Sequence, residues 1–433
     1  MFRLMLLTTI FSLFLLNHFT FAKEEAMPTF TISKVFTTRG GIHTTTRGTI
    51  RLVFVHQGKW LVFHGGPNRI HFSHDGVHWT GQEISQFGAR NHLIRGDTIY
   101  SFAHIDVAPD PEKRDMVAAT FQGTLRGETI EWGEPHRVPH LTLGYYEDLQ
   151  QDGTGRFTVS GRVMHFDDAG KVTGITIEWA RSLHPNDITA WGPQQQVIHQ
   201  VSDMKSSEVH ENIPLEEGKS YVIGMLSVNG QGRLYGNLFD LPADQASAQA
   251  GGEEWGEEDV WLAENMSTVR GTDKRMSAVW DPRAKVIHLS YVDHDSQLWV
   301  RTCQRPYRPE DWSEPIKLKP FKVFTNVMSL DTTKTPAHLW LLYGKTLFEH
   351  PDPRWQSGEL YLTKFDGESW RESVLVSEPG TKYNWYPNMN EDVSKGIGVL
   401  YLKGMPKNQA AVKQTDYDIM FSSTGAPQGG NSP

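Results

Sequence analysis

Seven short polar segments recur along the chain, each directly before a run rich in apolar residues. They combine arginine, histidine, tyrosine, carboxylate and amide side chains, which are the groups that transfer protons and bind anions. Packing gives no reason to place such groups at equivalent points of a repeat, whereas a ligand channel needs them. The alternative is a water-filled channel lined by solvated side chains. The segments are residues 44–47, 90–92, 145–148, 208–212, 273–275, 325–326 and 383–388.

Two kinds of chemistry fit these residue types. Histidine and tyrosine can abstract or deliver a proton, and two suitably spaced carboxylates can hydrolyse a glycosidic bond. The candidate catalytic residues are His92, Tyr146, Glu147, His210 and Glu211, with Asp148 and Asp273 as further carboxylates. Guanidinium groups bind carboxylates or sulfates, and aromatic rings can stack on sugar faces. The candidate substrate-binding residues are Arg47, Arg90, Arg275, Asn212, Trp385 and Tyr386.

A recurring tryptophan indicates the elements that must position these residues. It is followed by a short polar or proline-containing stretch and returns roughly every 50 to 70 residues, which is the length of one four-stranded propeller blade. The chain is also rich in glycine and evenly spaced aromatic residues, as expected of many short strands. The sequence therefore predicts an all-β protein. The copies are Trp79, Trp132, Trp191, Trp312 and Trp370, with a weaker one at Trp261.

Apolar alternation broken by a turn predicts one hairpin per repeat, the first over residues 49–63. Seven hairpins predict a single seven-bladed β-propeller, with six blades as the alternative. An orphan strand at residues 30–36 is expected to pair into the last blade and remove its open edge. The Gly/Ser/Pro-rich residues 422–433 are expected to be disordered. The other hairpins are expected at residues 92–103, 157–166, 221–226, 277–292, 337–343 and 396–402.

The N-terminus and the composition set the compartment and the partners. Residues 1–22 have the charge, apolar run and small-residue end of a secretory signal peptide, which leaves a propeller domain over 23–421 and predicts a secreted or periplasmic location. No later stretch is apolar enough to span a membrane. The single cysteine, Cys303, excludes an internal disulfide. The net charge of −9, with no basic block, argues against nucleic acid as a partner. We expect a monomer.

Four histidines crowd the first repeat and raise the question of a metal. His64, His71, His74 and His78 lie close together in sequence, but strand alternation would place them on different faces and no cysteine accompanies them. We therefore expect no cofactor, with a structural metal ion as the alternative.

The segment Ser73-His74-Asp75-Gly76-Val77-His78-Trp79 resembles the Asp box of sialidase-like β-propellers, and Asp366-Gly367-Glu368-Ser369-Trp370 resembles a truncated copy. In this motif the aspartate accepts backbone N–H bonds, the glycine takes a positive φ and the tryptophan packs between sheets. It is a folding device. A sialidase also needs an aspartate between its first arginine and its first Asp box, and residues 48–74 contain no acidic residue. This departure places the sialidase mechanism in doubt.

A second resemblance is to propeller-type polysaccharide lyases such as ulvan lyases and rhamnose–glucuronate lyases. It implies that arginine neutralises a uronate carboxylate while histidine or tyrosine serves as base and acid; His92 and His104, on one hairpin, echo the paired histidines of that family. We predict a secreted carbohydrate-active enzyme that cleaves an acidic or sulfated polysaccharide or oligosaccharide, with lyase chemistry favoured. The alternatives are a sialidase-like glycoside hydrolase and a non-catalytic carbohydrate-binding propeller.

Overall fold

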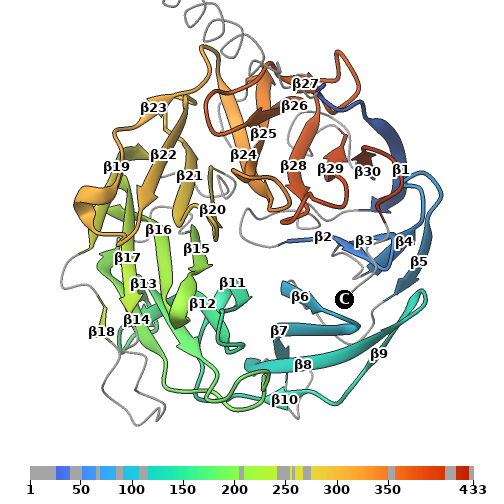
Figure 1. The fold of residues 1–433 in the computed structure, drawn as a ribbon. Coiled ribbons are helices and arrows are strands. Elements are labelled where there is room, and N and C mark those ends of the chain that lie inside the picture. The colour runs from blue at the N-terminus through green and yellow to red at the C-terminus, as the bar shows by residue number, and fades with distance from the viewer. Residues whose placement is uncertain are drawn as a thin grey trace, which may run out of the picture.

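The computed structural model describes residues 26–39, 51–64, 69–83, 91–106, 116–203, 209–240, 254–255, 259–266, 275–349, 356–404 and 416–428. The regular elements of these residues are β-strands, apart from two short 3-10 turns at Glu216–Gly218 and Pro309–Asp311. Their sheets stand around a common centre as a β-propeller (Figure 1). The predicted all-β propeller is confirmed.

Five of the sheets are separate and contain four or five antiparallel strands. The first comprises β2 (Val53–His56), β3 (Lys59–His64), β4 (Arg69–Ser73) and β5 (Thr80–Glu83); the second β6 (Asn91–Arg95), β7 (Thr98–Asp106), β8 (Met116–Arg126), β9 (Thr129–Trp132) and β10 (His136–Arg137). The third comprises β11 (Gly144–Gln151), β12 (Phe157–Phe166), β13 (Val172–Arg181) and β14 (Gln195–Ser202). The fourth comprises β15 (Val209–Pro214), β16 (Ser220–Val228), β17 (Gln231–Asp240), β18 (Glu254–Trp255) and β19 (Val260–Met266); the fifth β20 (Met276–Asp281), β21 (Val286–Val292), β22 (Leu298–Gln304) and β23 (Ile316–Lys317).

The remaining eight described strands form one larger sheet, which corrects the predicted count of seven separate blades. Gly358 of β26 (Ser357–Phe365) pairs with Asn384 of β28 (Asn384–Met389), and the Asn384 side-chain amide donates a 2.9 Å hydrogen bond to the Gly358 carbonyl. This contact joins strands that would otherwise form two sheets. The strands are β24 (Val323–Asp331), β25 (His338–Phe348), β26 (Ser357–Phe365), β27 (Val374–Leu375), β28 (Asn384–Met389), β29 (Gly398–Lys403), β30 (Asp416–Ser423) and β1 (Thr31–Arg39).

The innermost strands are β2, β6, β11, β15, β20, β24 and β28, which face the centre in Figure 1. Several of the predicted hairpins are wrong in detail. Residues 157–166 and 221–226 each lie within one strand, and all but the first residues of 337–343 and 396–402 do as well; each of these strands is the neighbour of an innermost strand. Each pairs with an innermost strand earlier in the chain whose polar residues interrupt the apolar alternation. Most described members of the polar segments therefore lie inside the innermost strands and not before them.

The Asp-box turn forms as predicted. Asp75 Oδ1 accepts hydrogen bonds from the backbone N–H groups of Val77 and His78, both at 2.8 Å, and Gly76 takes a φ of 76°. Trp79 packs edge-on against Phe421 of β30 and donates from Nε1 to the Ser33 hydroxyl of β1. The turn thereby fastens the first sheet to strands from both ends of the chain.

Strands from the two ends of the chain lie side by side. Strand β1 pairs antiparallel with β30, from Thr31 opposite Ser423 to Arg39 opposite Asp416. The prediction that the tail is disordered from residue 422 is wrong for its first residues. Ser422 and Ser423 belong to β30 and are fully buried, and the Ser422 hydroxyl bonds the Val376 carbonyl at 2.8 Å.

Candidate functional site

The C-terminal ends of the innermost strands border two neighbouring cavities. One cavity, of about 530 Å³, is lined mainly by residues of β2 and β6 and of the segment after β28. The other, of about 730 Å³, extends past the ends of β11, β15, β20 and β24. Arg51, Arg95, Gln150, Glu391 and Asp392 line both. We call this end of the channel the C-terminal mouth, and the end where the innermost strands begin the N-terminal mouth.

A histidine–carboxylate pair lies toward the N-terminal mouth. His104 Nδ1 is 3.0 Å from Glu147 Oε1, and the two side chains are 20% and 8% exposed. Strand β7 runs antiparallel to β6, so its end at His104 lies beside the start of that innermost strand. A register irregularity between Gly144 and Asp148 lets the first part of β11 depart from its partner strand. The carboxylate fixes one ring nitrogen, which leaves Nε2 as the nitrogen that can exchange a proton.

His210 belongs to the same neighbourhood. Its side chain is fully buried, and burial lowers its pKa to about 4, with Arg162 lowering it further and Glu147 opposing the shift. The imidazole is therefore neutral near pH 7. Glu147 and His210, both predicted from the sequence, are thus brought together. Tyr146 also lies in β11, but its side chain is outside the part that the structure describes.

His92 is placed apart from that group. Its Nδ1 is 2.7 Å from the Ser101 hydroxyl, and its ring stacks on Phe63 with 4.1 Å between centroids. Burial lowers its pKa to about 3, so the ring is neutral. It lies at the wall of the smaller cavity, and its predicted catalytic role stays a prediction.

Asp148 and Glu211 accept hydrogen bonds from the next innermost strand. Asp148 Oδ2 accepts the Asn212 backbone N–H at 2.8 Å, and Glu211 Oε2 accepts the backbone N–H of Ala278. The same arrangement recurs around the channel. The Ser277 hydroxyl accepts the Met328 N–H at 3.0 Å, and Asn388 Oδ1 accepts the Leu52 N–H at 2.9 Å. We call these four hydrogen bonds the inter-strand belt.

Burial changes the charge of the two belt carboxyls. It raises the pKa of Asp148 to about 7, although the Asn212 N–H, Gln150 and Arg51 oppose the shift. It raises the pKa of Glu211 well above its ordinary value, against the attraction of Arg51. Neither group is a fully ionised carboxylate near neutral pH.

The remaining predicted residues have well-defined surroundings or lie outside the described part. Arg275 is 2% exposed; Nη1 donates to the Asp293 carbonyl at 2.6 Å, and burial lowers its pKa to about 10. Asn212 Nδ2 donates to the Thr158 hydroxyl at 2.8 Å. Trp385 is 2% exposed, donates to the Gly404 carbonyl and lies beside Tyr386. Arg47, Arg90 and Asp273 lie outside the described residues.

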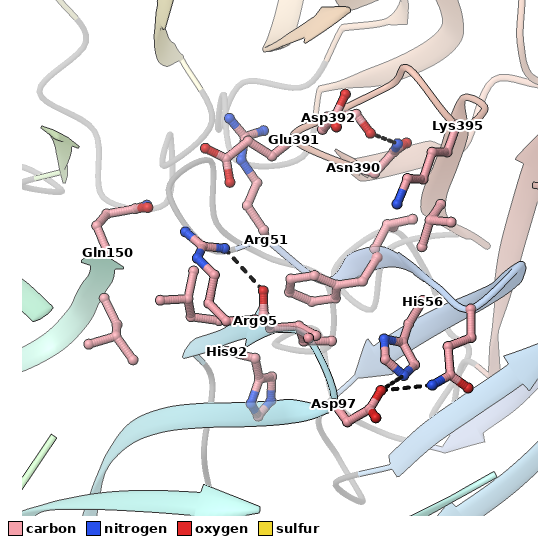
Figure 2. A pocket seen from close by; sticks show the side chains of 18 residues that line it. Arg51, His56, His92, Arg95, Asp97, Gln150, Asn390, Glu391, Asp392 and Lys395 are labelled. Atoms are coloured by element: carbon pink, nitrogen blue, oxygen red, sulfur yellow. Dashed lines mark hydrogen bonds and ion pairs between the residues drawn. The ribbon is translucent and has the colours of Figure 1, made fainter. Parts of the chain in front are cut away.

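Three residues of the C-terminal mouth were missed by the sequence analysis. Arg51, His56 and Arg95 lie before or at the ends of β2 and β6, and Figure 2 shows them around one cavity. The sequence signal was a set of charged residues a few positions after the first set, such as Arg51 after Arg47 and Arg95 after His92. These residues carry no recognisable pattern, because they lie within or just after the apolar runs and not directly before them.

Two of the first-repeat histidines face each other. His64 Nε2 and His71 Nε2 are 3.0 Å apart, and burial lowers the pKa of His71 to about 4. In the described part of the chain, no group of three or more His, Cys, Asp or Glu side chains is placed to hold a metal ion. The same residues include no helix long and apolar enough to cross a membrane.

No model of a known family and no curated protein matches this sequence. Solved structures do resemble it. A mutant of AofleA from Arthrobotrys oligospora has a TM-score of 0.45 at 10% identity, over 82% of this chain and 92% of the other. The NanB sialidase from Streptococcus pneumoniae has a TM-score of 0.44 at 11% identity, over 79% and 70%. The α-L-arabinofuranosidase Arb93A from Fusarium graminearum has a TM-score of 0.44 at 11% identity, over 78% of this chain and 98% of the other.

Proposed function

We propose that this protein is an exported carbohydrate-active enzyme that cleaves a uronate-containing polysaccharide by β-elimination, with His104 as the base. The observation that supports this is the His104–Glu147 pair, in which a partly exposed imidazole is held by a nearly buried carboxylate. A histidine oriented in this way can accept a proton from carbon near neutral pH.

The proposed step begins at C5 of a uronate. His104 Nε2 takes the C5 proton, the electron pair of that bond forms the C4–C5 double bond, and the C4–O bond breaks. The departing oxygen needs a proton, for which Tyr146, next to Glu147 in the sequence, is our candidate. Arg47 and Arg90 are the candidates for neutralising the uronate carboxylate, on sequence grounds alone.

The hydrolase alternative has less support among the described residues. It needs one ionised and one protonated carboxyl facing the same glycosidic bond. Asp148 and Glu211 are the buried candidates, and each accepts a backbone N–H of a neighbouring strand while burial raises its pKa. The inter-strand belt gives both a structural function that a substrate would have to displace.

The test is to incubate the full chain with uronate-containing and sulfated polysaccharides and to follow the ultraviolet absorbance of unsaturated uronate together with reducing ends. We expect both signals to rise together, and His104→Gln to lower the rate about 100-fold or more. His199→Gln is the matched control, because His199 Nδ1 also contacts a carboxylate, Asp259 Oδ1 at 3.1 Å, but on the outer strand β14.

Two outcomes would overturn the proposal. Reducing ends without absorbance would indicate hydrolysis, and equal rates for His104→Gln and the unaltered protein would remove His104 from the mechanism. If neither absorbance nor reducing ends rise with any polymer, the result would favour the carbohydrate-binding alternative.

The finer architecture is part of the same proposal. We infer that the eight-stranded sheet acts as two four-stranded blades, β24–β27 and β28–β30 with β1, so that seven innermost strands surround the channel. The support is that residues at or just beyond the ends of all seven border the C-terminal cavities. Pairing of β1 with β30 would then close the ring, and residues 1–22 would direct export.

A further inference from the structure

Arg51 is a buried cation at the C-terminal mouth. It lies two residues before β2, is 9% exposed, and its side chain lines both cavities beside the ends of the other innermost strands. Its Nη1 is buried and has no hydrogen-bond partner among the residues that the structure describes. A buried guanidinium N–H without an acceptor is costly, and an acceptor from a ligand would remove that cost.

Two buried carboxyls lie close enough to Arg51 to interact with its charge. Asp148 and Glu211 attract Arg51 electrostatically, but burial raises the pKa of both, so near neutral pH they carry less than two negative charges. Glu211 Oε1 is itself buried and has no partner within the described part of the chain. A protonated carboxyl at this position can donate to a ligand oxygen.

Arg95 brings a second guanidinium to the same cavity. Its Nε donates to Gln151 Oε1 at 3.1 Å and its Nη1 to the Ile94 carbonyl at 3.0 Å, which holds the group at the rim. Figure 2 shows Arg51 and Arg95 projecting into the space that Gln150, Glu391 and Lys395 also line. Paired guanidinium groups suit a planar carboxylate, which can accept bidentate hydrogen bonds.

The rim limits what can follow that carboxylate. Glu391 and Asp392 border both cavities, and Glu216 and Glu217 border the larger one. Carboxylates accept hydrogen bonds from sugar hydroxyls, but they repel the next acidic unit of a polyanion. The surroundings therefore favour one acidic unit that carries hydroxyl groups.

From these contacts we infer that the C-terminal mouth is a second binding site, separate from the His104–Glu147 pair, for a single uronic acid unit whose carboxylate is received by Arg51 and Arg95. The site is independent of the proposed catalytic step, because none of its lining residues belongs to that step. It fits a free monosaccharide, which is the kind of small acid that cleavage of a uronate polymer releases at its end.

The test is isothermal titration of the full chain with glucuronate, glucose and glucose 6-sulfate. We expect saturable binding of glucuronate, no measurable binding of glucose, and weaker binding of the sulfate ester. Arg51→Gln and Arg95→Gln should each weaken glucuronate about 10-fold or more, because each removes a charge-assisted pair. Arg95 lies at the rim, so Arg95→Gln keeps the test valid if Arg51→Gln fails to fold.

Two matched variants make the result specific. Arg126→Gln removes an exposed arginine whose partner is Glu131 on the outer strands, and should bind glucuronate as the unaltered protein does. His104→Gln should also bind glucuronate as the unaltered protein does. Failure of the lyase proposal would therefore not contradict this binding site. Absence of saturable glucuronate binding, equal binding of glucose, tighter binding of the sulfate ester, or unchanged binding by Arg95→Gln would each overturn the inference.

Discussion

The two faces of an innermost strand make different kinds of contact. Glu147 and Asp148 are neighbours in β11, yet one contacts His104 toward the N-terminal mouth and the other accepts the Asn212 N–H. His210 and Glu211 repeat the contrast in β15. Successive side chains of a strand point to opposite faces, so adjacent residues can contact a histidine and the next blade separately. A polar residue of the channel is therefore not a catalytic residue by its type alone.

The largest effect expected from this contrast is at Glu147. Glu147→Gln keeps the shape of the side chain but removes the charge that orients His104, so kcat should fall about 100-fold while KM changes little. Glucuronate binding at the C-terminal mouth should remain unchanged. A change in KM alone, with kcat intact, would assign Glu147 to substrate binding.

Asp148 tests the other face of the same strand through pH. Its folded-state pKa of about 7 lies above the ordinary value of 3.8, so it stabilises the fold fully below about pH 4 and this contribution is lost as pH rises toward 7. Asp148→Asn should remove that dependence. Between about pH 4 and pH 7 the free energy of unfolding of the variant should rise by up to about 4 kcal/mol relative to that of the unaltered protein, because one pKa unit corresponds to about 1.4 kcal/mol. Denaturant unfolding over that pH range measures it, and parallel curves for the two proteins would contradict the assignment.

Glu211 separates hydrogen bonding from charge. Glu211→Ala leaves the Ala278 N–H buried without an acceptor and should lower the free energy of unfolding by about 2 kcal/mol. Glu211→Gln retains a hydrogen-bond acceptor and carries no charge, so it should lower the free energy of unfolding much less than Glu211→Ala does. Thermal unfolding of both variants distinguishes them; equal losses would show that charge, and not the belt hydrogen bond, matters at this position.

The smallest effect is expected at Ser277, whose hydroxyl accepts the Met328 N–H. Ser277→Ala should lower the free energy of unfolding by about 1 kcal/mol, which is the usual contribution of one neutral hydrogen bond. Thr37→Ala is the control, since the Thr37 hydroxyl bonds Asp418 on an exposed surface. If both variants unfold at the same temperature, the belt contributes nothing measurable at Ser277.

Much of the fold was predictable from local pattern. The period of Trp79 and its counterparts indicated a propeller, because each blade repeats the same local packing problem. The turn at Asp75 was predictable in its hydrogen bonds, since they join residues within three positions of each other. The first hairpin, β2 with β3, also follows from alternation around a turn at Gly58.

The site was predictable only in part. Glu147 and His210 were recognised by residue type, but the contact of Glu147 with His104 and the interaction of Glu147 with His210 depend on how neighbouring sheets pack. Arg51 and Arg95 carry no local motif, and their importance follows from a cavity bordered by strands far apart in the sequence. The innermost strands were misplaced because their polar residues, which bond the next blade, interrupt the alternation that marks a strand.

The sequence by itself determined the strand-rich propeller class, the turn at Asp75 and the types of residue available to the channel. These depend on contacts between residues near in the chain, which composition and spacing reveal. Only the tertiary structure decided which blades join, which polar side chains are engaged by neighbouring backbones, and which cation is left at a cavity. Those outcomes depend on burial and on partners from distant strands, which no local pattern contains.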